Sequence, residues 1–166
     1  DVAMQNGSGD LEVAYAAGVT TGTQTQNIAL SNVAAGTLTI AGVENLNISS
    51  GVVKSTLTAL TAAAMKSITV TGSTDLTITG ALDFANDATG VAGAIDGTVD
   101  ASEFTGKLTV TSAADEVSIT GGSGNDTINM VATFNGYDKI DGGDGTDTLT
   151  MNAAALSTQF AQTSNI

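Results

Sequence analysis

Two nine-residue segments near the end of this chain constrain its fold more than any other feature. Each has glycine at its first, second and fourth positions, aspartate at its sixth and an aliphatic residue at its eighth; they span residues 121–129 and 142–150. Such glycine–aspartate segments are typical of a parallel β-roll. The glycine-rich half turns the chain, because glycine tolerates left-handed backbone angles, and the aliphatic residue of the short strand that follows points inward.

A degenerate third copy lies between the two intact ones. Residues 133–141 keep Gly136, Asp138 and Ile140 in register but lack the leading glycine pair, and residues 130–132 are inserted after the first copy. Since two copies make one coil, the first and third are expected to stack on one edge of the roll. The degenerate copy is expected on the other edge.

The same spacing predicts a calcium site. Calcium takes roughly six to eight oxygen ligands, and the segment offers both carbonyl and carboxylate oxygens. The expected ligands are Gly122, Gly124 and Asp126 from the first copy and Gly143, Gly145 and Asp147 from the third, with Asn125 and Asp144 assisting. Asp138 is expected to provide half a site on the opposite edge.

The preceding part of the chain repeats a pattern of strand, short turn and strand. The pattern occurs in residues 38–49, 68–79 and 108–120, where aliphatic residues such as Leu38 and Ile40 alternate with threonine or another small residue. Alternation at period two indicates half-buried strands. The sequence therefore predicts an all-β chain, with a parallel β-solenoid favoured over a β-sandwich, which also accommodates such strands.

Short helical turns are expected between the repeats. In residues 55–66, the spacing of Leu57, Leu60 and Ala64 is that of one helix face. Residues 100–107 are expected to form a single turn, with Asp100 as its N-cap.

Composition excludes several functional classes. The chain has 17 acidic residues against 4 basic ones, a net charge of −13, and no histidine or cysteine. Binding to nucleic acid or to an anionic membrane surface needs clustered cations. Zinc sites and most nucleophilic or general-base devices need cysteine or histidine, so we expect no enzyme activity. No apolar run approaches the length of a membrane span, about 18 residues or more.

Residues 121–150 resemble the RTX repeats of proteins secreted by Gram-negative type I systems. The Thr/Ala/Gly-rich remainder, with the phrases Ala-Gly-Val-Glu-Asn-Leu-Asn-Ile at 41–48 and Val-Asp-Ala-Ser at 99–102, resembles the bodies of bacterial surface-layer (S-layer) proteins and large RTX adhesins. The resemblance implies an extracellular, cell-surface protein that binds Ca²⁺. It departs from the usual pattern in having only two intact nonapeptides.

Three hypotheses about function follow. The first is a structural module of a surface layer that self-assembles into a lattice or oligomer in calcium. The second is a calcium-rigidified segment of a cell-surface adhesin, whose partner is a glycan or a host surface, and the third is an accessory domain of a secreted hydrolase. A cell-surface glycan or lipopolysaccharide is a further expected partner. We expect a β-repeat body over 1–120, a calcium-binding segment over 121–151, and a segment over 152–166 that leads into a further module.

Overall fold

A computed structural model shows a parallel β-solenoid of about six turns. It describes residues 1–16, 21–85, 93–112, 116–130, 134–151 and 163–166, and these contain no helix. The strands are β1 (Val2–Gly7), β2 (Leu11–Val13), β3 (Thr25–Ile40), β4 (Asn45–Ser50), β5 (Ser55–Thr61), β6 (Ser67–Gly72), β7 (Leu76–Leu82), β8 (Gly97–Asp100), β9 (Leu108–Ser112), β10 (Val117–Thr120), β11 (Thr127–Met130), β12 (Lys139–Asp141), β13 (Thr148–Met151) and β14 (Thr163–Ser164). The expected all-β solenoid is confirmed, and the β-sandwich alternative is not what forms.

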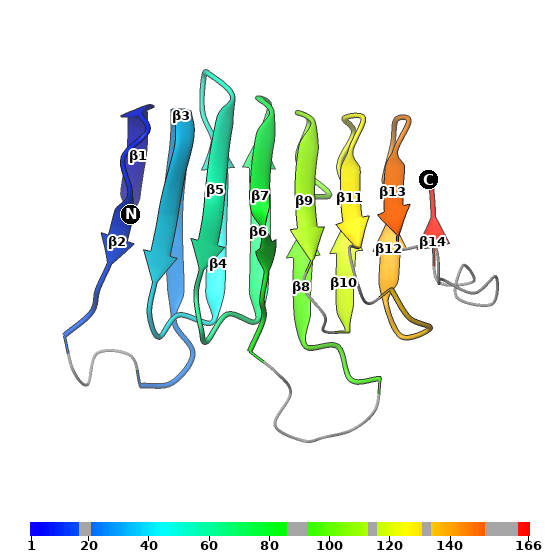
Figure 1. Ribbon diagram of the computed structural model, residues 1–166, viewed down its shortest axis with the longest axis horizontal. Helices are drawn as coiled ribbons and strands as arrows, with labels where there is room; N and C mark the ends of the chain where they lie inside the picture. The colour runs from blue at the N-terminus through cyan, green and yellow to red at the C-terminus, as the bar shows by residue number, and fades with distance from the viewer. Residues whose placement is uncertain (17–20, 86–92, 113–115, 131–133, 152–162) are drawn as a thin grey trace.

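Two parallel sheets face each other and share the long strand β3 (Figure 1). The first sheet contains β1, the first half of β3, β4, β6, β8, β10, β12 and β14. The second contains β2, the second half of β3, β5, β7, β9, β11 and β13. The chain passes from the first sheet to the second at what we call the upper edge of Figure 1, and returns at the lower edge.

Aliphatic side chains stack between the sheets in register. In the first sheet, one inward-facing column of side chains occupies the same register position in successive strands: Leu46, Ile68, Val99, Ile119 and Ile140. Each of these residues is at most 2 % exposed. Full burial of such a side chain contributes roughly 1.5–3 kcal/mol. The column explains how a chain with 4 % aromatic residues still forms a continuous core.

Threonine fills the alternate, outward positions of the second sheet. Thr56 pairs with Thr77, and the same register position continues through Thr109, Thr127 and Thr148. β-Branched side chains suit a pleated, half-exposed surface. The alternation of threonine with Leu, Ile or Val in the sequence is therefore the alternation between the outside and the core of one sheet.

Hydrogen-bonded partners in neighbouring coils are mostly 18 to 22 residues apart in sequence. The separation rises to 32 residues across the coil that contains the long connection 83–96. The three sequence repeats do not all start in the same sheet: residues 38 and 108 begin segments in the second sheet, and residue 68 begins one in the first. The repeating unit that the sequence displays is a strand–corner–strand half-coil, which occurs at both edges.

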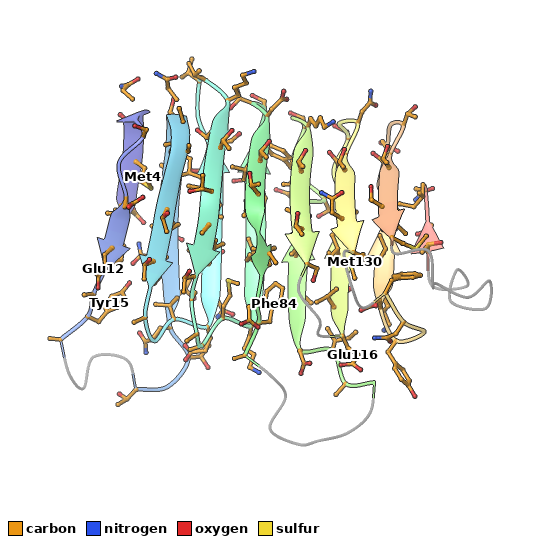
Figure 2. All side chains as sticks on the ribbon, in the orientation of Figure 1. Met4, Glu12, Tyr15, Phe84, Glu116 and Met130 are labelled. Atoms are coloured by element: carbon orange, nitrogen blue, oxygen red, sulfur yellow. The ribbon has the colours of Figure 1, made fainter. Side chains whose placement is uncertain are left out.

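Phe84 closes the lower edge of the core (Figure 2). It is 2 % exposed, and a Cβ placed on Gly97 would overlap its ring. The side chain that covers this corner therefore requires glycine at the start of β8. Met4 and Met130, which are also buried, mark the core toward the two ends of the view in Figure 2.

The expected helical turns do not form in the described residues. Residues 55–61 are strand β5, which pairs with β3 on one side and β7 on the other. Leu57 is paired with Gly36 and Ala59 with Thr37, so Thr58 is an extra residue in β5. This β-bulge moves the following leucine onto the core face and produces the three-residue spacing that suggested a helix. Strand β5 pairs with a neighbour on both sides. A helix in its place would leave the facing edges of β3 and β7 unpaired.

The segment 100–107 forms a turn, as its sequence suggests, but not a helix. The N–H of Phe104 donates to the carbonyl of Ala101 at 2.8 Å, and Asp100 accepts the N–H of Ser102 at 3.0 Å. Of the expected C-terminal segment 152–166, residues 152–162 lie outside the described residues, and β14 pairs with β12.

Candidate functional site

The two intact glycine–aspartate copies lie in successive coils on the upper edge. Their strands, β11 and β13, are hydrogen-bonded neighbours in which Thr127 pairs with Thr148 and Ile128 with Leu149. The corner 121–126 therefore lies directly beside the corner 142–147. The strand of the degenerate copy, β12, belongs to the other sheet and follows a corner on the lower edge. The expected stacking of the first and third copies is what the register shows.

All three motif aspartates make the same contact with the preceding coil. The Oδ1 atoms of Asp126, Asp138 and Asp147 accept backbone N–H groups at 2.8, 3.0 and 2.7 Å. The donors are Leu108, Val117 and Asp126, and each is the residue that the strand register places opposite. Each carboxylate thus fastens its own coil to the one before it.

The second carboxylate oxygens differ among the three residues. Oδ2 of Asp126 accepts the N–H of Gly122 at 2.8 Å, and Oδ2 of Asp138 accepts the N–H of Asn135 at 2.7 Å. Oδ2 of Asp147 is buried without a hydrogen-bond partner. A buried carboxylate oxygen without a partner is costly, so this atom is where an added cation stabilises the structure most.

Glycine is required in these corners because carbonyl oxygens approach from the neighbouring coil. A Cβ on Gly122 would overlap the carbonyl oxygen of Phe104, one on Gly143 that of Gly122, and one on Gly145 that of Gly124. Gly143 and Gly145 also have backbone φ angles of +86° and +121°, which other residues rarely adopt. The glycines bring backbone oxygens of one coil against the next, close to the aspartates.

The two assisting residues occupy exposed positions on the same corners. Asn125 already makes an inter-coil hydrogen bond, because its Oδ1 accepts the N–H of Thr146 at 3.0 Å. The backbone N–H of Asp144 donates to the carbonyl of Gly122 at 2.9 Å, and the Asp144 side chain is exposed. The structure thus brings the eight upper-edge residues of the predicted site together. Asp138, the ninth, lies on the lower edge.

Burial raises the pKa of Asp126, and the negative charge of Asp147 raises it further. The N–H groups of Leu108 and Gly122 and the positive charge of Lys107 act in the opposite direction. Burial likewise raises the pKa of Asp138, with a further contribution from Glu116, against the N–H groups of Val117 and Asn135. A nearby cation would favour the ionised form of both carboxylates and so lower both pKa values.

A metal ion at this edge would depend on carbonyl as well as carboxylate oxygens. Among the described residues, no cluster of three or more His, Cys, Asp or Glu side chains is placed to hold a metal. The carboxylates of Asp126 and Asp147 and the carbonyl oxygens of Gly121, Gly122, Gly124 and Gly142 all lie at these two stacked corners, so the donors available here are oxygens. Such a set suits a hard cation.

The inward direction of the motif aspartates was not part of the sequence prediction. Asp126 is 1 % exposed, and the register places Leu108 and Leu76 at the equivalent position of the two preceding coils. A signal for this was present, because Asp126, Ile128 and Met130 alternate at period two and so share one face of the chain. The aspartate replaces a core leucine.

The raised pKa values of Asp126 and Asp138 lead to a pH prediction. A carboxyl whose pKa is higher in the folded than in the unfolded state destabilises the folded state as pH rises through the folded value. The metal-free protein should therefore melt at a higher temperature in mild acid, just above the ordinary aspartate value of 3.8, than at pH 7. Below the ordinary aspartate value of 3.8 the trend should reverse, because hydrogen bonds lower the pKa of Asp100 and Asp141.

Thermal melts in chelator across this range test the prediction. Asp138→Asn cannot ionise, so its melting temperature should depend less on pH than that of the wild type. Because its amide group faces the N–H of Asn135 in place of Oδ2, the variant should also be less stable than the wild type. A melting temperature that falls steadily from pH 7 to about pH 5 in both proteins would contradict it.

Comparisons with protein-family models, with curated proteins and with solved structures found no match. No helix long and apolar enough to cross a membrane occurs in the described part of the chain.

Proposed function

We propose that this chain is a structural, calcium-binding module of an extracellular surface-layer protein, and that calcium orders it and promotes its self-assembly. One observation carries the proposal: the corners 121–126 and 142–147 stack in register, with an unpartnered buried oxygen of Asp147 at their junction. The proposal has Ca²⁺ bound between these corners.

The choice of calcium rests on donor chemistry. The chain has neither histidine nor cysteine, so its metal ligands are oxygens. Calcium accepts flexible, mixed sets of carbonyl and carboxylate oxygens, whereas magnesium demands near-ideal octahedral geometry and retains several waters. Extracellular calcium modules work with dissociation constants of about 10⁻⁴–10⁻³ M, which suits a site with two carboxylates.

The structural role rests on shape and charge. Successive coils stack along one axis, so that both parallel sheets run the length of the molecule (Figure 1). The net charge of −13 makes copies repel one another. Lateral association of such copies is favoured where a divalent cation neutralises acidic edges. Asp144, which is exposed beside the proposed site, is available for this contact.

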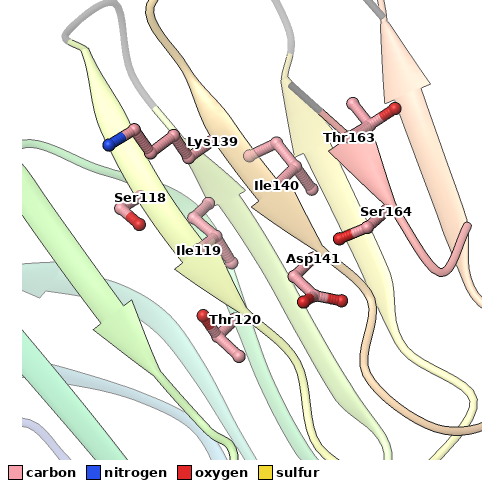
Figure 3. A pocket seen from close by; sticks show the side chains of 8 residues that line it. All are labelled: Ser118, Ile119, Thr120, Lys139, Ile140, Asp141, Thr163 and Ser164. Carbon is pink, nitrogen blue, oxygen red and sulfur yellow. The ribbon is translucent and has the colours of Figure 1, made fainter. Parts of the chain in front are cut away.

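A depression on the first sheet favours a second candidate, a calcium-rigidified adhesin segment that binds a glycan. It has a volume of about 320 Å³ and lies over β10, β12 and β14 (Figure 3). Ser118, Thr120, Lys139 and Asp141 contribute hydroxyl and charged groups to it. Hydrogen bonds from Asn165 and Gly143 lower the pKa of Asp141, so it serves as an acceptor for sugar hydroxyl groups and not as a proton donor.

Assembly experiments test the first proposal and separate it from the second. Light scattering and electron microscopy of the chain should show sheets or oligomers at millimolar calcium that disperse in chelator. Magnesium at the same concentration is the control and should not replace calcium. A chain that binds calcium yet stays monomeric at high calcium would contradict the surface-layer role and favour the adhesin segment.

A further inference from the structure

The upper-edge corner before β9 is two residues longer than those of the intact copies but shares two of their inter-coil backbone contacts. A Cβ on Gly124 would overlap the carbonyl oxygen of Gly106, just as one on Gly145 would overlap that of Gly124. The N–H of Ser123 donates to Phe104 at 2.9 Å, as the N–H of Asp144 donates to Gly122. The carbonyl oxygens of 104–106 therefore face the first copy as the carbonyl oxygens of the first copy face the third.

The side chains at this corner differ from those of the intact copies. Register places Leu108 opposite Asp126, and Lys107 opposite Asn125. This corner thus has carbonyl oxygens like those of the proposed calcium site. Where that site has a carboxylate it has Leu108, and the residue before it is the positively charged Lys107. The backbone N–H of Lys107 donates to Oδ1 of Asp75 at 3.0 Å, so the residue lies between an acid of the preceding coil and Asp126 of the next.

We propose that Lys107 is a built-in counter-cation that keeps calcium out of the corner on the N-terminal side of the proposed site. Its ammonium group provides the positive charge beside Asp126 that calcium provides between Asp126 and Asp147, and it repels a divalent ion from the space between 104–107 and 122–126. Lys107 is a positioning residue, because it acts through Asp126 and does not bind the ion. The inference rests on the proposed calcium site.

The place of Lys107 in the chain supports this assignment, because it directly precedes Leu108, whose N–H donates to Oδ1 of Asp126 at 2.8 Å. The charge of Lys107 is among the influences that lower the pKa of Asp126, opposite in sign to that of Asp147. Asp126 therefore lies between one positive and one negative neighbour along the upper edge. A cation near a calcium ligand weakens binding of the ion, and removal of an exposed charge that water largely screens should tighten binding by roughly three- to tenfold.

The test is calorimetric titration of the full chain with calcium chloride. Lys107→Gln should bind calcium roughly three- to tenfold more tightly than the wild type at low ionic strength, with the difference reduced by added salt. Lys54→Gln is the matched control, since Lys54 precedes β5 on the same edge, beyond Asp75. It should leave the affinity within twofold, and Lys107→Arg should restore the wild-type value.

A gain of stoichiometry tests the same idea in the opposite direction. The double variant Lys107→Asn with Leu108→Asp reproduces the side chains of the first copy and should bind one additional calcium per chain. If that variant does not fold, the affinity of the single variant Lys107→Asn, expected to rise as in Lys107→Gln, decides. Equal affinities in the Lys107 and Lys54 variants would overturn this inference alone. A wild-type chain that binds no calcium would overturn the proposed function as well.

Discussion

In chelator, the coils that contain β10 to β13 are expected to lose stability and to open locally, while the coils built from β3 to β7 remain closed. The reason is the replacement of core leucine by aspartate at one upper-edge position. Leu76 and Leu108 hold this position by apolar burial, whereas Asp126 and Asp147 place negative charge there. Burial of charge needs compensation that the protein itself provides only in part, because one oxygen of Asp147 has no partner.

The expected size of the effect follows from linkage. Calcium at 100 times its dissociation constant adds about 2.7 kcal/mol for one site. For a chain of this length, each kcal/mol shifts the melting temperature by roughly 2–4 °C, so chelation should lower it by about 5–11 °C.

Hydrogen exchange shows which coils lose stability in chelator. The amides of Ser123, Asp144 and Thr148 donate to carbonyls of a neighbouring coil and should lose protection in chelator. Amides in β4 and β6, whose strands pair in the middle of the first sheet, are the internal control and should stay protected. Equal protection of both groups with and without calcium, together with an unchanged melting temperature, would show that the ion has no role in order.

The fold was predictable because a solenoid produces a local sequence pattern that repeats in every coil. Period-two alternation, as in Leu76–Thr77–Ile78, indicates which residues face the core, and the glycine–aspartate segments indicate where the chain turns. Stacking of similar half-coils then builds the two parallel sheets. Helix was wrongly expected in 55–66 because a bulge at Thr58 changes the spacing of core residues, and a bulge depends on pairing with β3 that local sequence does not show.

The site was predictable in membership but not in mechanism. The motif names Asp126 and Asp147, yet only the register shows that each accepts an N–H group from the coil before it. The role of Lys107 was also beyond sequence reasoning. Coil lengths vary, and partners such as Lys107 and Asp75 are 32 residues apart, so no fixed period places them side by side.

Asp147→Asn should abolish the calcium response while leaving the metal-free protein at least as stable as the wild type. The asparagine keeps an oxygen to accept the N–H of Asp126, and its amide group occupies the place of the unpartnered Oδ2, so no protein hydrogen bond is lost. It also removes the negative charge that raises the pKa of Asp126. Two unit charges 4 Å apart repel by roughly 1–4 kcal/mol between the dielectric of water and an effective value of 20.

Two comparison variants separate a ligand role from a purely structural one. Asp126→Asn puts an amide donor against the N–H of Gly122, so it should destabilise the protein by about 1–3 kcal/mol with or without calcium. Asp75→Ala removes an exposed acceptor of an upper-edge N–H outside the motif and should leave calcium stoichiometry unchanged. Melts and calcium titrations of the three variants settle the roles.

If Asp147→Asn still gains several degrees on calcium addition, the ion does not bind at Asp147. If it is destabilised in chelator as much as Asp126→Asn, then Oδ2 of Asp147 has a structural role, and its lack of a hydrogen-bond partner is no sign of a missing cation.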